Sequence, residues 1–156
     1  MRTIQSLAGY FFLAGVMLLS LGPSWVAAVE VNPPLPTGRV ILSGRVTVIA
    51  ELARSLQEKG RGLSGRPGLG PDQGMLFVYE QPQSIGIWMK DMRFALDILW
   101  VQHGRIVRIV TNAPPLAPGG PETVYTATGD LVLEVPAGFT TKHGIKVGDP
   151  AKVVLH

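Results

Sequence analysis

Glycine and proline interrupt this chain throughout its length, with 19 glycines and 13 prolines among 156 residues. Both residues are common in tight turns and unfavourable inside helices and central strands. This punctuation favours many short strands joined by turns over a bundle of helices. Apolar residues make up 46% of the chain and charged residues 16%, so a folded core is expected. The length suits a single domain.

The runs between the turns carry the pattern of strands. The strongest signal is a hairpin, in which residues 96–101 and 105–110 are joined at His103 and Gly104. Other strands are predicted at residues 45–50, 74–79, 85–90, 124–127, 130–135 and 151–155, with turns at 81–84 and at 128–130, and residues 40–42 are a candidate for a short edge strand. The predicted fold is mostly β, an antiparallel β-sandwich or barrel-like single domain of seven or eight short strands with one α-helix.

The one predicted helix covers Glu51 to Gly60. Leu52 and Leu56 recur there at a spacing of four, and Gly60 is a natural stop. Leu52, Ala53 and Leu56 would pack on a sheet. A single helical turn is also predicted around residues 140–143.

Two long segments rich in glycine and proline, residues 61–74 and 112–121, are predicted to be loops. Loops of this length without structure of their own are usually functional or disordered. The first of them lacks the Gly-Lys-Ser/Thr ending of a phosphate-binding loop, so its glycines do not indicate a nucleotide site.

The first 28 residues have the three parts of a secretory signal peptide. Arg2 is followed by an apolar run from Leu7 to Leu21, and small residues precede Val29. Cleavage is expected near Ala28, because the run is shorter than the roughly 20 residues of a spanning helix. The alternative is an uncleaved membrane anchor. Residues 29–38 form a proline-rich linker, and residues 39–156 form the domain, which either reading places outside the cytoplasm.

Several kinds of partner are not expected. The formal net charge is +3, and Lys and Arg do not cluster along the chain, so we expect no nucleic-acid partner. The absence of cysteine excludes disulfides, thiolate catalysis and cysteine metal sites. His103, His143 and His156 lack the spacing of metal ligands, so neither a metal nor another cofactor is predicted.

Trp88 and Lys90 are the most informative pair of candidate site residues. In a strand they would share one face with Gly86, which leaves room beside them. A tryptophan beside a cation could form the floor of a shallow ligand pocket; alternatively, Trp88 is core and Lys90 extends over it into solvent. Arg61 and Arg66, at the glycine-rich loop, could bind an anionic group or could simply be exposed loop charges.

Two carboxylates interrupt apolar runs. Asp97 lies between Leu96 and Ile98, and it either points outward or is buried with a partner among Arg61, Arg66 and Lys90. Glu134 is the second acid. A structural salt bridge and a catalytic acid or base are both open for Asp97.

The chain resembles the DUF192 (UPF0127) family. The resemblance covers residues 46–154 and is carried, in order, by Arg-Gly-Leu at 61–63, Gly-Arg at 65–66, Gly-Met-Leu-Phe-Val at 74–78, Trp-Met-Lys at 88–90, Leu-Asp-Ile at 96–98, Asn-Ala-Pro-Pro at 112–115, Leu-Glu-Val-Pro-Ala-Gly at 133–138 and Gly-Ile-Lys-Val-Gly-Asp at 144–149. It implies a compact, mostly β domain, often exported, with no assigned function. Asp91-Met92 departs from the Asn-Thr typical of the family, and the loop after the double proline lacks the cysteine that many members carry.

These observations lead to three hypotheses. The first is a binding module for a small polar or anionic ligand, such as a sugar or carboxylate, at a face formed by Trp88, Lys90, Arg61 and Asp97, with Arg66 and Glu134 as further candidates. The second is an envelope hydrolase that uses Asp97 or Glu134 as acid or base. The third is a protein-interaction or structural domain.

Overall fold

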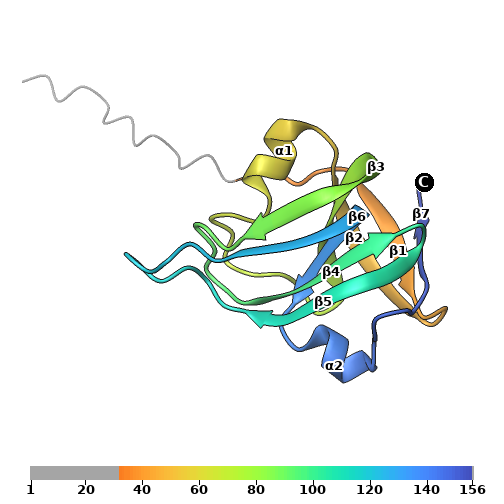
Figure 1. The fold of residues 1–156 in the computed structure, drawn as a ribbon. Helices are drawn as coiled ribbons and strands as arrows, with labels where there is room; N and C mark the ends of the chain where they lie inside the picture. Colours follow the sequence, from red (N-terminus) through yellow and green to blue (C-terminus); the bar gives the residue numbers. More distant parts are fainter. Residues whose placement is uncertain (1–31, 156) are drawn as a thin grey trace, which may run out of the picture.

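The computed structural model describes residues 32–155, so the predicted signal peptide and its cleavage site lie outside the described residues. The described chain forms one curled sheet of seven strands with two short helices (Figure 1). The strands are β1 (Thr37–Leu42), β2 (Val46–Ala53), β3 (Gln73–Trp88), β4 (Leu96–Gln102), β5 (Arg105–Ala113), β6 (Val124–Pro136) and β7 (Ala151–Val154). Their order across the sheet is β5-β4-β6-β3-β2-β1-β7.

The mostly β class and the number of strands are confirmed, but the prediction of a purely antiparallel sandwich or barrel is wrong. β2 and β3 pair in parallel, with Leu52 beside Leu76, whereas the other pairs are antiparallel. The cause is the connection between them, which carries a helix and a long loop and returns the chain to the end of the sheet where β2 began. Parallel neighbours need such a crossover of about a dozen residues or more.

The helix predicted over Glu51–Gly60 is also wrong in its bounds. β2 continues to Ala53, because Leu52 and Ala53 pair with β3 and are buried. The helix α1 (Leu56–Arg61) begins only after Ser55, whose side chain accepts from the Glu58 N–H while the Glu58 carboxylate accepts from the Ser55 N–H. This capping box fixes the start. Leu56 is therefore 88% exposed instead of packed on the sheet.

The predicted turns at 81–84 and 128–130 do not break the strands. β3 and β6 each run through without interruption, and four residues of β3 lie opposite one residue of β6 where the register shifts between Val78 and Gln83. Such an irregularity bends a strand pair. Beyond it, Ile85 packs in one cluster with Trp100 of β4, and its carbonyl accepts a hydrogen bond from the Trp100 indole N–H at 3.0 Å.

Both faces of the central strands are buried. On one face, Leu99 and Leu133 pack with Val40, Val48 and other apolar residues of β1 and β2. The second helix, α2 (Phe139–His143), confirms the turn predicted at 140–143 and adds Phe139 to this face. On the other face, side chains such as Trp100, Ile98 and Phe77 pack beneath the bent outer part of β3 and the loop after α1, which contributes Leu63.

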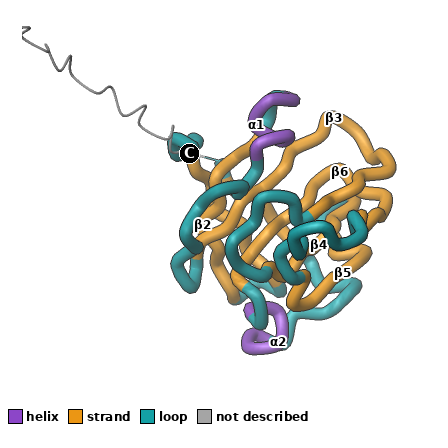
Figure 2. Tube along the Cα trace, turned by 90° about the vertical axis from the view of Figure 1, so that its left-hand side faces the viewer, coloured by secondary structure: helices purple, strands orange, loops and turns teal. Residues whose placement is uncertain are grey.

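The predicted hairpin is confirmed. β4 and β5 are joined at His103 and Gly104. Their φ angles of 50° and 72° are both positive, as a two-residue type I′ hairpin turn requires. The loops at residues 62–72, 89–95 and 114–123 gather at one end of the sheet, which faces the viewer in Figure 2. Among the described helices, neither has the length and apolar content needed to cross a membrane.

Candidate functional site

Trp88 and Lys90 lie where β3 ends among the gathered loops. Ile85, Ile87 and Met89 are buried, whereas Trp88 is 49% exposed and Lys90 is exposed, so the predicted alternation of the two faces holds. The Lys90 ammonium lies 5.5 Å from the centre of the Trp88 ring. At this distance the cation is attracted by the face of the ring, and it stays in solvent where a ligand can reach it.

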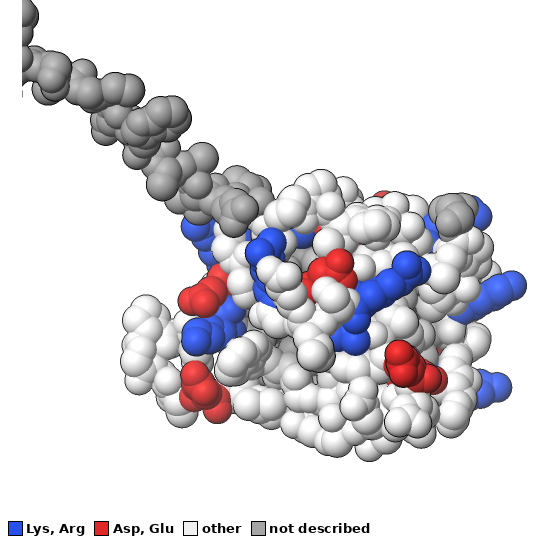
Figure 3. All heavy atoms as spheres, turned by 90° about the horizontal axis from the view of Figure 1, so that it is seen from above, with Lys and Arg blue, Asp and Glu red and all other residues white. Residues whose placement is uncertain are grey.

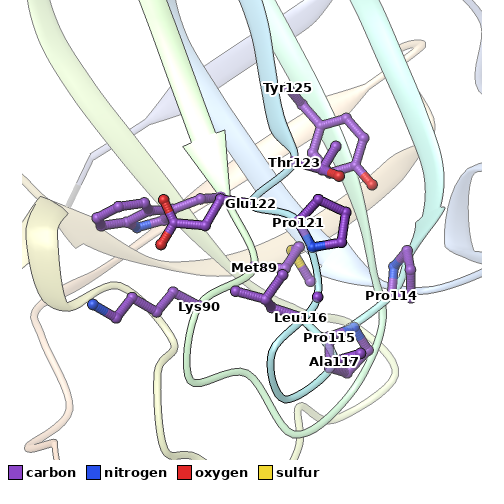
Figure 4. Close-up of a pocket in the computed structure, with 12 residues that line it drawn as sticks. Met89, Lys90, Pro114, Pro115, Leu116, Ala117, Pro121, Glu122, Thr123 and Tyr125 are labelled. Carbon is purple, nitrogen blue, oxygen red and sulfur yellow. The ribbon is translucent and has the colours of Figure 1, made fainter.

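A cavity of about 230 Å³ opens beside this pair. Its opposite wall is the loop between β5 and β6, which supplies three prolines, Pro114, Pro115 and Pro121 (Figure 4). The Leu116 N–H donates to the Met89 carbonyl at 3.1 Å and ties this loop to the end of β3. The cavity therefore combines an aromatic ring, rigid apolar rings and a cation.

Charged groups lie on one side of this cavity. In Figure 4 the Lys90 ammonium and the Glu122 carboxylate lie together on that side, whereas Pro114 and Tyr125 lie on the other. The prolines and Tyr125 were not among the residues that we selected from the sequence. The signal that could have found them is the long loop containing Asn-Ala-Pro-Pro, because long ordered loops often carry function.

A second, smaller cavity of about 70 Å³ lies between α1 and the sheet. Its polar lining consists of Lys59, Arg61, Tyr79 and Glu134, together with Ser64, and Trp88 lines both cavities. Glu134 is only 5% exposed, and burial raises its pKa to about 8. Burial also raises the pKa of Tyr79, and the nearby charge of Glu134 raises it further. Arg61 and Glu134, two of the predicted site residues, thus share one cavity.

Asp97 lies on the opposite face of the sheet from Glu134. Strand alternation gives this result, since Asp97 pairs with Val135 and Ile98 pairs with Glu134. The Asp97 carboxylate is fully buried and accepts from the N–H groups of Asn112, Gly138 and Thr140 at 2.8, 3.1 and 2.9 Å, and from the Thr140 hydroxyl. The prediction that Asp97 pairs with Arg61, Arg66 or Lys90 is wrong, because backbone donors satisfy it instead.

This carboxylate has a positional role. Gly138, the N-cap of α2, has no side chain that could accept hydrogen bonds from N–H groups at the start of the helix. Asp97, which lies on β4, accepts from the Gly138 and Thr140 N–H groups instead. Its bond to Asn112 fixes the chain where the proline-rich loop leaves β5, at a residue with φ of 53°. Asp97 therefore anchors α2 and the root of the loop that lines the larger cavity.

Arg66 is not an exposed loop charge. Its guanidinium binds both oxygens of Glu51 on β2, and the two side chains are only 12% and 15% exposed. Although burial raises the pKa of Glu51, hydrogen bonds from Arg66 and from the Leu35 N–H lower it below its usual value. Arg66 thus holds the glycine-rich loop against the sheet and is not directed toward Trp88.

The structure therefore places the predicted site residues in separate surroundings. Trp88 and Lys90 lie together, Arg61 and Glu134 lie in the adjoining cavity, and Arg66 and Asp97 hold the framework. Within residues 32–155, no group of three or more His, Asp or Glu side chains is placed to hold a metal ion.

Comparison with known proteins finds one family and two similar structures. The model of the DUF192 family, described as an uncharacterized ACR, matches residues 39–153. A protein from Sinorhizobium meliloti 1021, provisionally described as a transcription regulator, is 30% identical with a TM-score of 0.71, over 79% of this chain and 98% of its own. A protein of unknown function from Novosphingobium aromaticivorans DSM 12444 is 34% identical with a TM-score of 0.71, over 80% of this chain and 91% of its own. Comparison with curated proteins gives no match.

Proposed function

The chain belongs to the DUF192 family, and from this starting point we propose that it is a binding module for a small ligand with a flat, mostly apolar body and an anionic group. The observation that carries the proposal is the half-exposed Trp88, which borders a cavity of about 230 Å³ with a cation beside its ring. Tryptophan side chains are on average largely buried, because burial of so large a ring contributes strongly to stability. Its exposure beside a cavity favours contact with a ligand.

The lining of the cavity supports the class of ligand. Trp88, Tyr125 and the prolines offer flat faces against which a ring can stack, and the Lys90 ammonium can bind a carboxylate or phosphate at the open side. Glu122 on the same side would repel a second negative charge, which favours a ligand with one anionic group.

A stability screen tests this proposal. We expect an aromatic carboxylate to raise the unfolding temperature of the protein more than its uncharged amide does, because only the carboxylate can pair with the Lys90 ammonium. A ligand at a hundred times its Kd adds about 2.7 kcal/mol to the stability, which is a measurable shift. Lys90→Gln should weaken binding by about tenfold or more, because a hydrogen bond to a charged group contributes about 1.5–3 kcal/mol. Trp88→Ala should abolish the shift.

Lys152→Gln is the matched control, since Lys152 is an exposed lysine on β7, away from the cavity. A ligand that stabilises the Trp88→Ala and Lys90→Gln proteins as much as the wild type would contradict the proposal. In that case the exposed pair of Trp88 and Val124, which lie opposite each other in the β3–β6 register, would favour the protein-interaction hypothesis.

The placement of the two acids does not favour hydrolysis, and the distribution of charge does not favour DNA binding. Asp97 and Glu134 lie on opposite faces of the sheet, so they cannot act as a pair on one substrate bond. One similar structure is described as a regulator, but cations and acids are interspersed on the face seen from above in Figure 3, without the continuous basic stripe that DNA contact favours.

We further propose that the protein acts outside the cytoplasm, a view supported by the signal-like pattern of its first 28 residues. Protein isolated from its own cells should then begin at Val29, immediately after the small-residue site. N-terminal sequencing checks this expectation, and a chain that retains Met1 and stays in the membrane fraction would support the anchor instead.

A further inference from the structure

The smaller cavity contains an acid that the proposed function does not use. Glu134 projects from β6 into a space of about 70 Å³ between α1 and the sheet. A cavity needs about 10–15 Å³ on this measure to hold one water molecule, so this one can hold a group of a few heavy atoms. It is too small for a whole sugar or nucleotide.

Glu134 has no polar partner in the part of the chain that the structure describes: no hydrogen bond or ion pair to its carboxyl group is formed. Its neighbours across the strands are Met75 and Ile98, both apolar and buried. Because burial raises its pKa to about 8, the group carries its proton at neutral pH. It is then a neutral hydrogen-bond donor that lines a cavity, and none of the described residues accepts from it.

Two cationic side chains line the same cavity, in which Glu134 is buried and Arg61 is exposed. The Lys59 ammonium lies 4.1 Å from the centre of the Tyr79 ring, and Arg61 follows at the end of α1. Lys59, Arg61 and Tyr79 are the titratable groups that line the cavity with Glu134, and the residues that face Glu134 from β3 and β4 are apolar. A buried donor and two cations around one cavity are suited to an anion that accepts hydrogen bonds.

We propose that this cavity binds the carboxylate group of a small ligand, with the Glu134 carboxylic acid donating a hydrogen bond to it and Lys59 and Arg61 balancing its charge. A carboxylic acid and a carboxylate form a strong, charge-assisted hydrogen bond when both are removed from water. The site is distinct from the larger cavity, and the two share only Trp88.

The geometry gives the site a defined pH dependence. When Glu134 loses its proton, it presents a second negative charge to the bound carboxylate, and the donor is lost. Binding should therefore be strongest below the pKa of about 8 and should weaken above it. A site for an amine would show the reverse, because an amine would pair with the ionised acid.

Acetate is the probe, and acetamide is its uncharged control. We expect acetate to bind at pH 6.5, as followed by chemical-shift changes of the protein, and its Kd to rise about thirtyfold by pH 9.5, the loss of protonated acid expected for a pKa of about 8. Acetamide should bind weakly at both pH values. Absence of acetate binding at pH 6.5, or binding that strengthens as the pH rises, would overturn the proposal.

Three variants locate the site. Glu134→Gln keeps a donor, so acetate should still bind and the pH dependence should flatten. Glu134→Leu keeps the size but removes the donor, so affinity should fall at least about tenfold, and Lys59→Gln should weaken binding without affecting the core. Equal affinity in Glu134→Leu and wild type would contradict the assignment.

The Lys90→Gln variant separates this proposal from the preceding one. It should leave the acetate affinity unchanged, since Lys90 lines only the larger cavity. A loss of acetate binding in Lys90→Gln would place the anion in the larger cavity and overturn the assignment to Glu134.

Discussion

Asp97→Ala is expected to lower the free energy of unfolding by about 5 kcal/mol, a third or more of the stability of a typical domain. The substitution removes the acceptor of the Asn112, Gly138 and Thr140 N–H groups and of the Thr140 hydroxyl. Each buried donor left without a partner costs about 1–3 kcal/mol, and the whole domain is stabilised by only about 5–15 kcal/mol. Urea unfolding followed by circular dichroism measures the loss.

Two milder variants show whether the loss follows the number of donors. Thr140→Val removes only the hydroxyl and should cost about 1 kcal/mol, because the three backbone N–H groups keep their acceptor. Asp97→Asn should lie between the two, since one of its two positions turns from acceptor into donor. Equal stability of Asp97→Ala and Thr140→Val would mean that water replaces the carboxylate, contrary to the prediction.

Glu134→Gln is expected to change the pH dependence of stability by about 3 kcal/mol between pH 4.5 and pH 7. The unfolded chain releases the Glu134 proton near 4.5, whereas the folded protein holds it until about 8. Between these values the unfolded state binds fewer protons, so the stability of the wild type falls as the pH rises, by about 1.4 kcal/mol for each pH unit. Glutamine has no proton to release and lacks this loss.

The measurement compares thermal unfolding of wild type and Glu134→Gln at both pH values. Relative to the wild type, the variant should gain roughly 10 °C on going from pH 4.5 to pH 7. Other titrating groups, including Glu51 with its lowered pKa, are common to both proteins and cancel in the comparison. Parallel curves for the two proteins would show that Glu134 is ionised in the folded state.

Local pattern was sufficient to predict several parts of this molecule. Turn chemistry at His103 and Gly104 predicted the β4–β5 hairpin, and the period of two predicted that Trp88, at the end of β3, and Lys90, just after it, are exposed on one side. The start of α1 could also have been predicted, because Ser55 and Glu58 have the spacing of a capping box. The repeat of Leu52 and Leu56 led to the wrong boundary instead.

The facing of Asp97 and Glu134 could not be predicted in the same way. The period of two says that neighbours in a strand point to opposite sides, but it does not say which side is wet when both are buried. All six residues from Leu96 to Val101 are buried in β4, so the sequence does not indicate to which face the side chain of an acid within this run points. Only the register with β6 separates Asp97 from Glu134.

The two cavities depend on contacts between distant segments. The larger one requires the loop before β6 to return to the end of β3, and the smaller one requires the parallel crossover that brings α1 over β6. Loop closure of this kind leaves no periodic trace in the sequence, so Tyr79, Lys59 and the prolines were not recognised as lining residues.

The pairing of β1 with β7 has a consequence for how the protein is made. Among the described strands, β1 is synthesised first and β7 last, yet Leu42 pairs with Ala151 and both belong to the same core. Until Ala151–Val154 have emerged, one edge of β1 keeps unpaired N–H and C=O groups, which invite pairing with other chains. Folding during translation therefore stops one strand short, and a nascent chain cut off before Ala151 should be a target for chaperones and proteases.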